Sequence, residues 1–220
     1  MFVTFEGPEG AGKSTAIRAI SAQLTERGLD VVKTREPGGG PLGQRIRQML
    51  LEEGSVSPET ELLLFLADRA NHVETIIQPA LDAGKFVLCD RHADSTIVYQ
   101  GYGRGLDLEF LRAANRFATK GLVPDLTLLF DLDPKIGLDR LNIVEKNLFD
   151  TEAKRRDVNR LDREPLEFHQ KVRNGFLTIS REEPERFVIL DAEKSPEQLV
   201  EEALTAILAR QKGHTSLNTR

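Results

Sequence analysis

The sequence predicts an α/β protein whose parallel sheet is covered by helices on both faces. Short apolar runs alternate along the chain with longer segments of helical periodicity, the pattern of strands joined by crossover helices. The apolar runs are rich in Val, Ile, Leu and Phe, as strands buried on both faces should be. The length of 220 residues is enough for one such domain with a sizeable core.

The predicted elements follow one another in a regular order. Five strands are expected near residues 2–6, 30–34, 86–90, 126–131 and 186–190. The first helix is expected from about Ser14 to Arg27, because Gly28 is a typical residue just after a helix end. Ser57 and Pro58 predict the start of a later helix, with Ser as the N-cap and Pro at the first position.

A glycine-rich loop joins the first strand to the first helix. It reads Glu6-Gly7-Pro8-Glu9-Gly10-Ala11-Gly12-Lys13-Ser14-Thr15, which contains the pattern G-x-x-x-x-G-K-[ST] between a strand and a helix, as that pattern requires. Its glycines let backbone N–H groups point at an anion, and the helix N-terminus adds to the attraction. We therefore expect a P-loop that binds a nucleoside triphosphate, with Lys13 on the β- and γ-phosphates and Ser14 on Mg²⁺. A purely structural turn is the alternative.

Composition narrows the classes of partner. The net charge of −5 gives no electrostatic footprint for nucleic acid. The single Cys89 cannot form an internal disulfide, which is compatible with a reducing compartment. The sequence has neither an apolar run of about 18 residues nor a signal-peptide pattern. We expect a cytoplasmic protein that binds neither nucleic acid nor a membrane.

Two polar segments follow the predicted second and third strands, where open α/β sheets hold their ligands. The first reads Thr34-Arg35-Glu36-Pro37-Gly38-Gly39-Gly40-Pro41, and its glycines suit close approach to a substrate or, alternatively, a plain connector. The second reads Asp90-Arg91-His92. Asp90 is expected to hold the Mg²⁺ shell and Arg91 to neutralise phosphoryl charge. The alternative is a structural ion pair between the two residues.

A pair of side chains on the helix after Ser57 suits a planar base. Phe65 and Arg69 lie four residues apart and therefore share one face. Core packing of Phe65 and pairing of Arg69 with Asp68 or Glu74 are the alternatives. The segment 94–105 is dense in hydrogen-bonding side chains and ends in glycines, so it suits recognition of a base or sugar or forms a surface loop. His72 is expected to be structural or exposed, since no second His or Cys lies at metal-ligand spacing.

The last third of the chain contains the expected lid. A helix near Ile136–Leu141 is followed at about 142–158 by a segment of mixed charge and weak periodicity, whose basic residues can close onto ATP phosphates or lie in solvent. The next helix is expected to open at Asn159-Arg160-Leu161-Asp162 and to reach about Ile179. We expect one domain over 1–211 and a disordered polar tail over 212–220.

Taken together, these segments resemble the bacterial thymidylate kinases, a family of P-loop nucleoside monophosphate kinases. The resemblance covers nearly all of 1–211. It depends on the P-loop, the segments 34–39, 90–92, 95–101 and 124–127, and the helix of Phe65 and Arg69. It implies Mg²⁺-dependent transfer of the γ-phosphoryl group of ATP to dTMP in dTTP synthesis, on a five-stranded sheet with a lid, commonly in a homodimer.

The resemblance also assigns roles to individual residues. It makes Phe65 the stacking platform for thymine, Arg69 its hydrogen-bond donor, and Arg47 a holder of the dTMP phosphate. It places Glu9 near the sugar, while Ser14 and Asp90 hold the metal. The implied substrate-binding residues are Glu36, Arg47, Phe65, Arg69, Arg91, Ser95, Thr96, Tyr99 and Gln100.

The sequence departs from the family pattern in two places. Position 8 is Pro and the P-loop has no Arg, which resembles the subtype that draws catalytic arginines from the lid. The usual D-R-x-E after the lid reads Asn159-Arg160-Leu161-Asp162, and the lid is longer than in many relatives. The catalytic residues implied are Lys13, Arg91, Glu9, Arg155, Arg156 and Arg160. A GTPase-like switch is disfavoured because no N-K-x-D segment occurs, whereas a kinase for another nucleoside monophosphate stays open.

Overall fold

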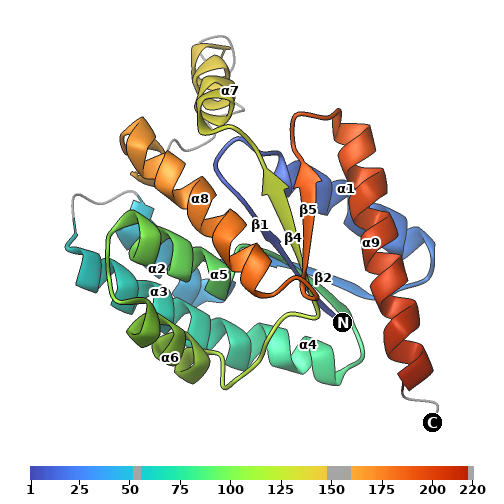
Figure 1. Ribbon diagram of the computed structural model, residues 1–220. Helices are drawn as coiled ribbons and strands as arrows, with labels where there is room; N and C mark the ends of the chain where they lie inside the picture. The colour runs from blue at the N-terminus through green and yellow to red at the C-terminus, as the bar shows by residue number, and fades with distance from the viewer. Residues whose placement is uncertain (52–55, 148–159, 218–220) are drawn as a thin grey trace.

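The computed structural model describes residues 1–51, 56–147 and 160–217. Its centre is a parallel sheet in the order β2-β3-β1-β4-β5 (Figure 1). The predicted strands and the α/β class are confirmed, and each strand begins and ends within one residue of its predicted position. The strands are β1 (Phe2–Glu6), β2 (Val31–Arg35), β3 (Phe86–Asp90), β4 (Leu126–Asp131) and β5 (Phe187–Asp191).

The register of the sheet brings the strand ends together at one edge. Phe5 pairs with Asp90, Arg35 also pairs with Asp90, and Glu6 pairs with Leu129. The chain moves from β1 outward to β2 and β3 on one side and then crosses to β4 and β5 on the other. Such a change of direction opens a crevice beyond the carboxyl ends of the strands, which is where ligands bind in this class of fold.

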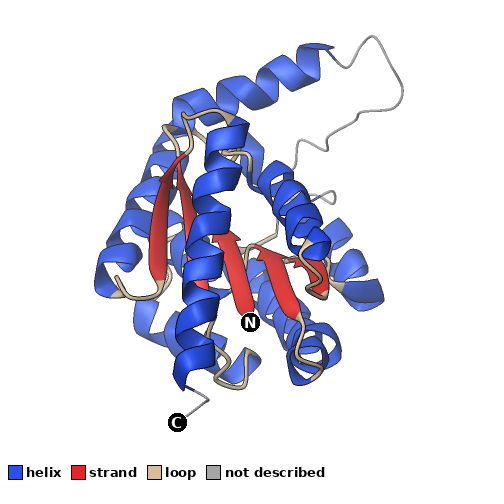
Figure 2. Cartoon of the chain, turned by 90° about the vertical axis from the view of Figure 1, so that its right-hand side faces the viewer, coloured by secondary structure: helices blue, strands red, loops and turns tan. Residues whose placement is uncertain are grey.

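Helices cover both faces of the sheet, as Figure 2 shows. On one face, α1 (Lys13–Glu26) and α9 (Pro196–Leu217) pack their apolar sides onto the strands in one buried cluster. On the other face, a second cluster joins α3 (Pro58–His72), the π-helical segment η2 (Ile97–Gly103) and α8 (Leu166–Glu182). These two layers fix the helices whose ends surround the crevice.

The remaining helices complete the two layers. Ser57 is the N-cap of α3, where its Oγ accepts a hydrogen bond from the Thr60 N–H at 3.2 Å, and Pro58 is the first residue, both as predicted. Within the described ranges, no helix combines the length and the apolar character that crossing a bilayer needs. The other helices are α2 (Gly40–Leu51), η1 (Val73–Ile77), α4 (Gln78–Asp82), α5 (Ala93–Thr96), α6 (Leu108–Ala118), α7 (Pro134–Asn147) and η4 (Leu161–Arg163).

Three helix boundaries differ from the predictions. The helix α7 reaches Asn147 and so includes the first residues of the expected lid. The helix expected to open near residue 159 begins instead at Leu166, after a short 3₁₀ turn. Pro165 explains this break, because the residue before a proline is driven out of the helical region, and Glu164 is extended with ψ 153°. Finally, α9 continues to Leu217, into the segment expected to be a disordered tail.

Candidate active site

A pocket of about 830 Å³ lies at the carboxyl edge of the sheet. The P-loop forms its floor, the ends of β2 and β3 and the helices α2, α3 and η2 form one end, and α7 and the start of α9 form the other. All nine predicted substrate-binding residues line this pocket, and so does the P-loop from Glu9 to Thr15. Gly7 and Pro8 lie behind it and contribute backbone carbonyl groups.

The P-loop glycines are required by packing as well as by ligand approach. Gly7 has φ 135°, and a Cβ there would lie 2.3 Å from the carbonyl oxygen of Phe130 in β4. Gly10 has φ 69°, and its Cβ would meet the carbonyl oxygen of Gly137 in α7 at the same distance. At Gly12, the N-cap of α1, a Cβ would meet open space, although φ is 87°. All three glycines suit the approach of phosphates, but Gly7 and Gly10 are also needed for close packing of the loop against β4 and α7.

Lys13 places its ammonium over the P-loop. Its Nζ donates to the carbonyl oxygens of Gly7 at 2.9 Å and Pro8 at 2.7 Å. Burial, followed by the positive charge of Arg91, lowers the pKa of Lys13 to about 8, although nearby carboxylates oppose the shift. The ammonium is therefore charged at neutral pH and aimed at the space where phosphates would lie.

Ser14 and Asp90 meet across the pocket. The Ser14 hydroxyl donates to Oδ2 of Asp90 at 2.6 Å, which joins the start of α1 to the end of β3. Mg²⁺ prefers oxygen ligands and is often held by one or two protein groups together with substrate phosphates and water. The hydroxyl and carboxylate oxygens of this pair suit such an ion. Within the described ranges, no group of three or more His, Cys, Asp or Glu could hold a metal.

Arg91 is held between the P-loop and η2. Its Nη1 donates to the Gly7 carbonyl oxygen at 3.0 Å, and its Nη2 donates to Oε2 of Glu9 at 2.6 Å. The backbone of Arg91, directly after β3, has φ 70°, in the left-handed region. The Tyr99 hydroxyl donates to the same Glu9 oxygen at 2.6 Å. Arg91 thus pairs with Glu9, whereas the alternative had paired it with Asp90.

Arg91 and Glu9 each stabilise the charged form of the other. Burial by itself would lower the pKa of Arg91, but Glu9 and then the other acidic groups around it raise that pKa above its ordinary value. Burial by itself would raise the pKa of Glu9, but Arg91 and Lys13 lower it. Both groups therefore stay ionised, and the guanidinium remains a fixed positive charge beside the P-loop.

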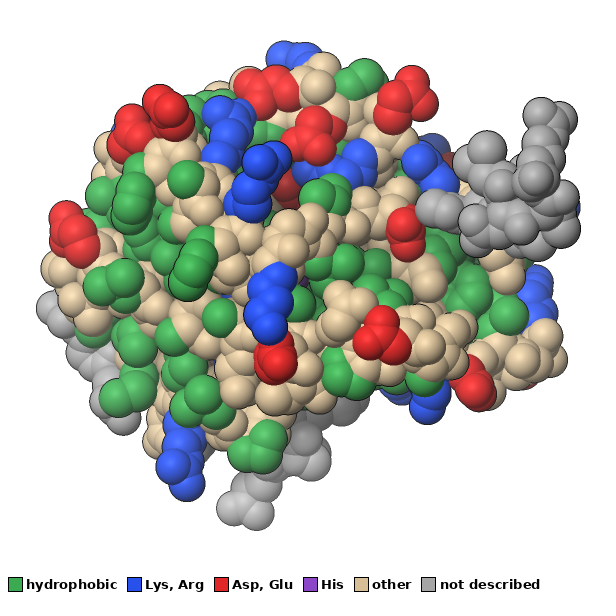
Figure 3. Space-filling model, turned by 90° about the horizontal axis from the view of Figure 1, so that it is seen from below, with side chains coloured by type: hydrophobic (Ala, Val, Ile, Leu, Met, Phe, Trp, Pro, Cys, Tyr) green, Lys and Arg blue, Asp and Glu red, His purple; other side chains and the backbone are tan. Residues whose placement is uncertain are grey.

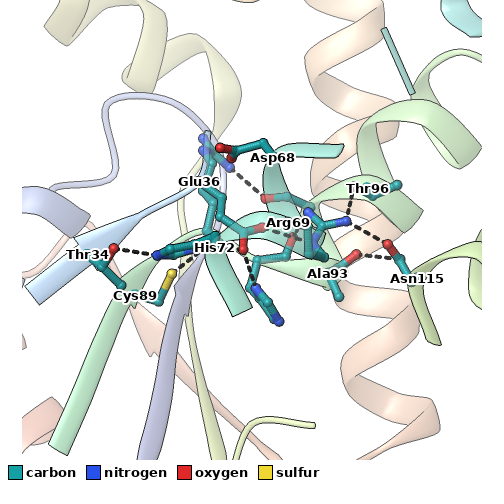
Figure 4. A network of polar contacts seen from close by, with 12 residues as sticks. Thr34, Glu36, Asp68, Arg69, His72, Cys89, Ala93, Thr96 and Asn115 are labelled. Carbon is teal, nitrogen blue, oxygen red and sulfur yellow. Dashed lines mark hydrogen bonds and ion pairs between the residues drawn. The ribbon is translucent and has the colours of Figure 1, made fainter. Parts of the chain in front are cut away.

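Arg69 is buried at the opposite end of the pocket, with 1% of its surface exposed (Figure 4). Its Nε donates to Oε2 of Glu36 at 2.8 Å. Its Nη1 donates to Thr96 and Asn115, and its Nη2 donates to the carbonyl oxygen of His92. These bonds use four of the five N–H groups of a guanidinium and leave one on Nη2. The pairing with Asp68 or Glu74 considered from the sequence is wrong, because Glu36 is the partner.

Glu36 is the centre of this network in Figure 4. Its Oε1 lies 2.9 Å from Nδ1 of both His72 and His92. Burial opposes ionisation, but His92 and Arg69 lower the pKa of Glu36 well below its ordinary value. His72 also contacts the Thr34 hydroxyl through Nε2 and is fully buried, so the structural role predicted for it is confirmed. Glu36 thereby fixes the position of the Arg69 guanidinium in the pocket wall.

The other substrate-binding candidates surround Arg69. Phe65 lines the pocket and also packs against the second buried cluster, so the core packing considered as the alternative is present. Thr96 and Gln100 are both 1% exposed. Arg47 donates from Nη1 to the Pro37 carbonyl oxygen at 3.1 Å.

Of the three arginines predicted to act from the lid, the structure describes only Arg160. Arg155 and Arg156 lie outside the described residues. Arg160 is described, but it does not line the pocket in this structure. Its Nη2 forms an ion pair with Glu61, and its Nε donates to the Leu50 carbonyl oxygen at 3.2 Å. This pairing was not predictable from the sequence, because Glu61 and Arg160 are 99 residues apart.

Several functional candidates were missed by sequence reasoning. Glu6, at the end of β1, accepts the His92 N–H at 2.8 Å and the Ser95 hydroxyl at 2.6 Å. Burial, followed by the charge of Asp94, raises the pKa of Glu6 to about 7. A charged residue at the end of a mostly apolar strand was a signal available in the sequence. Arg140 of α7 lines the other end of the pocket and donates to the Gly10 carbonyl oxygen at 3.3 Å.

The fold and the site define a class of protein. A P-loop before α1, a Ser–Asp pair for a metal and an arginine at the end of β3, beside a second polar subsite, are the features of a P-loop nucleotide kinase. Comparison with known proteins narrows the class. The family model described as thymidylate kinase matches residues 5–203. The chain belongs to the thymidylate kinase family, which phosphorylates dTMP with ATP.

Individual relatives agree over nearly the whole chain. A thymidylate kinase of Desulfovibrio desulfuricans is 54% identical over 211 residues, which is 95% of each chain. One of Carboxydothermus hydrogenoformans is 50% identical and covers 90% of this chain and 92% of its own. The crystal structure of thymidylate kinase from Ehrlichia chaffeensis superposes with a TM-score of 0.75 at 31% identity, covering 94% of this chain and 98% of that one.

Proposed function

We propose that this chain phosphorylates dTMP with ATP by holding the two nucleotides end to end along the pocket, with their phosphates meeting between Lys13 and Arg91. One observation carries the proposal. The Lys13 ammonium and the Arg91 guanidinium both donate to the Gly7 carbonyl oxygen, at 2.9 Å and 3.0 Å. Two cations from different elements therefore converge on one point of the P-loop, beside the start of α1.

The two ends of the pocket suit different nucleotides. ATP phosphates fit the P-loop and the N-terminus of α1, with Arg140 and Lys194 toward the far end. The dTMP base fits the opposite end, where Phe65 offers a ring face and Arg69 one remaining N–H. Arg47 lies beside that end and suits the dTMP phosphate.

Phosphoryl transfer requires positioning and charge stabilisation more than covalent chemistry. The acceptor is a phosphate oxygen that is already ionised at neutral pH, so the chain needs no general base. Lys13 stabilises charge on the donor phosphates, and Arg91 neutralises charge that develops between donor and acceptor. Glu9 and Tyr99 keep Arg91 at that position through the bonds described above. Ser14 and Asp90 would hold Mg²⁺, which would neutralise part of the negative charge on the donor phosphates.

The base assignment is tested by a panel of nucleotides. Release of ADP is measured with ATP and each of dTMP, dCMP, dGMP and dAMP. We expect the highest kcat/KM with dTMP. Preference for another base would assign the chain to a different nucleoside monophosphate kinase while leaving the P-loop chemistry intact.

We also propose that the protein is a cytoplasmic homodimer. Neighbouring helices α2, α3 and α6 carry large apolar side chains at the surface, among them Leu42, Met49, Leu63, Phe110 and Phe117. Leu42 and Met49 on α2 are seven residues apart and so share a helix face, and the same holds for Phe110 and Phe117 on α6. Figure 3 shows hydrophobic side chains gathered on the left of the molecule seen from below. Phe117 is 86% exposed, which favours burial against a second copy.

Light scattering tests the oligomeric state. The wild-type chain is expected to elute with the mass of two chains, and Phe117→Glu is expected to shift it toward one chain, because a charge then enters an apolar contact. A monomeric wild type at micromolar concentration would contradict the dimer while leaving the kinase proposal in place.

A further inference from the structure

Gln100 is buried in the pocket beside Arg69, and one neighbour determines how its amide is turned. Its Nε2 donates to Oε1 of Glu61 at 2.8 Å. Both residues are 1% exposed. Oε1 of Gln100 makes no hydrogen bond within the part of the chain that the structure describes, and the residue lines the pocket. The carbonyl oxygen is therefore the atom that this amide offers to a ligand.

Glu61 imposes this orientation because it can only accept hydrogen bonds. Its Oε2 forms an ion pair with Arg160, and Arg104 lies 3.4 Å from each of its two oxygens. Burial favours the neutral acid, but the bonds from Arg160 and Gln100 and the charge of Arg104 lower the pKa of Glu61 below its ordinary value. An ionised carboxylate has no proton to donate. If the Gln100 amide were turned over, two oxygens would face each other inside the protein, which is costly.

A fixed acceptor beside a fixed donor distinguishes two pyrimidines. The four acceptors around Arg69 leave it one N–H donor, on Nη2, and Glu61 leaves Gln100 one carbonyl acceptor. Thymine presents an O4 acceptor next to an N3–H donor, which matches this pair. Cytosine presents an N4 amino donor next to a bare N3 acceptor, which opposes it at both positions.

We infer that Glu61 is a specificity-determining positioning residue, which makes Gln100 an acceptor for the N3–H of the base and so selects thymine over cytosine. This inference rests on the proposed placement of the dTMP base between Phe65, Arg69 and Gln100. Glu61 contacts no substrate in this account and acts through Gln100.

The substitution Glu61→Gln is the direct test. A glutamine has one oxygen, which the two guanidinium groups attract, and Arg160 contacts the Oε2 position. The new amide nitrogen then faces Gln100 and turns that side chain over, so that an NH₂ group faces the base. We expect the ratio of kcat/KM for dTMP to that for dCMP to fall at least about tenfold, the scale of one unmade buried hydrogen bond. Glu61→Asp keeps an acceptor-only group and is expected to retain the preference for dTMP.

Controls separate this role from a structural one. Glu59→Gln, at an exposed position two residues away on α3, is expected to keep the wild-type ratio. The double variant E61Q/R104Q removes one of the two cations that face the new amide of residue 61. It is measured beside E61Q so that the test does not depend on the folding of the single variant. Thermal unfolding with dTMP or dCMP gives a binding readout independent of turnover, and dCMP is expected to gain relative to dTMP.

The possible outcomes are distinct. If E61Q or the double variant lowers kcat/KM for both nucleotides equally, Glu61 is merely structural and the inference is overturned. A wild-type chain with no preference for dTMP would refute the base assignment itself, and the inference with it. A wild-type preference that persists unchanged in E61Q refutes the inference alone.

Discussion

Removing the Arg91 side chain should separate catalysis from folding. Its guanidinium contacts the Gly7 carbonyl oxygen, the Ser95 hydroxyl and the Glu9 carboxylate. Loss of one positioned group that stabilises transition-state charge lowers kcat by about 100-fold to 1,000-fold, or about 3–4 kcal/mol. We therefore expect at least about a 100-fold lower kcat for Arg91→Ala, with a smaller change in the KM for ATP.

The same substitution has a cost in stability that the structure also bounds. Glu9 loses its ion pair but keeps the hydrogen bond from Tyr99, and its side chain is 10% exposed. Loss of a hydrogen bond to a charged group costs about 1.5–3 kcal/mol. For a chain of this size that lowers Tm by roughly 3–12 °C, so the variant should remain folded at 25 °C.

A coupled assay of ADP release at saturating dTMP and ATP gives kcat, and thermal unfolding gives Tm. Arg181→Ala, at an exposed position of α8 outside the pocket, serves as the control and is expected to turn over like wild type. Near-normal kcat in folded Arg91→Ala would refute the role assigned to Arg91.

Three further predictions concern the pocket and the buried carboxyl group of Glu6 beside it. Because burial lowers the pKa of Lys13 to about 8, kcat/KM for ATP should fall as pH rises through that value, and a pH profile flat to pH 10 would contradict the role of its ammonium. Phe65→Ala should raise the KM for dTMP by about tenfold to 100-fold with little change in the KM for ATP, since stacking on a base contributes about 1–3 kcal/mol; equal changes in both KM values would count against it. The raised pKa of Glu6, about 7, means that the folded chain holds a proton that the unfolded chain releases above its ordinary pKa of 4.5. Glu6 should therefore make the wild type less stable as pH rises from about 4.5 to 7, and Asp68, whose pKa is raised to about 6, contributes in the same direction. Glu6→Gln should make this decline smaller in urea titrations across this range.

The parts of the molecule set by local sequence were predictable. The strands carry continuous apolar runs, and the P-loop is a contiguous pattern whose neighbours on both sides agree with it. The N-cap at Ser57 was likewise readable from two adjacent residues. The break before α8 was also predictable, because Pro165 prevents the preceding residue from being helical. The predicted helix nevertheless ran from about residue 159 across this proline.

The contacts between residues of the site were less predictable from the sequence, because only the fold brings these residues together. Arg69 was singled out by its spacing from Phe65, but its partner Glu36 is 33 residues away and Asn115 is 46 residues away. Local reasoning therefore proposed its near neighbours as partners. The pairing of Glu61 with Arg160 and Gln100 depends in the same way on the packing of α3 against segments far along the chain.

The most direct test of the account is the structure of a complex with dTMP and a non-hydrolysable ATP analogue. The account predicts that the dTMP phosphate and the terminal phosphate of the analogue lie next to each other, within hydrogen-bond distance of Arg91 and Lys13 respectively. A dTMP bound away from Phe65 and Arg69, or an Arg91 side chain directed away from the meeting point of the phosphates, would contradict it.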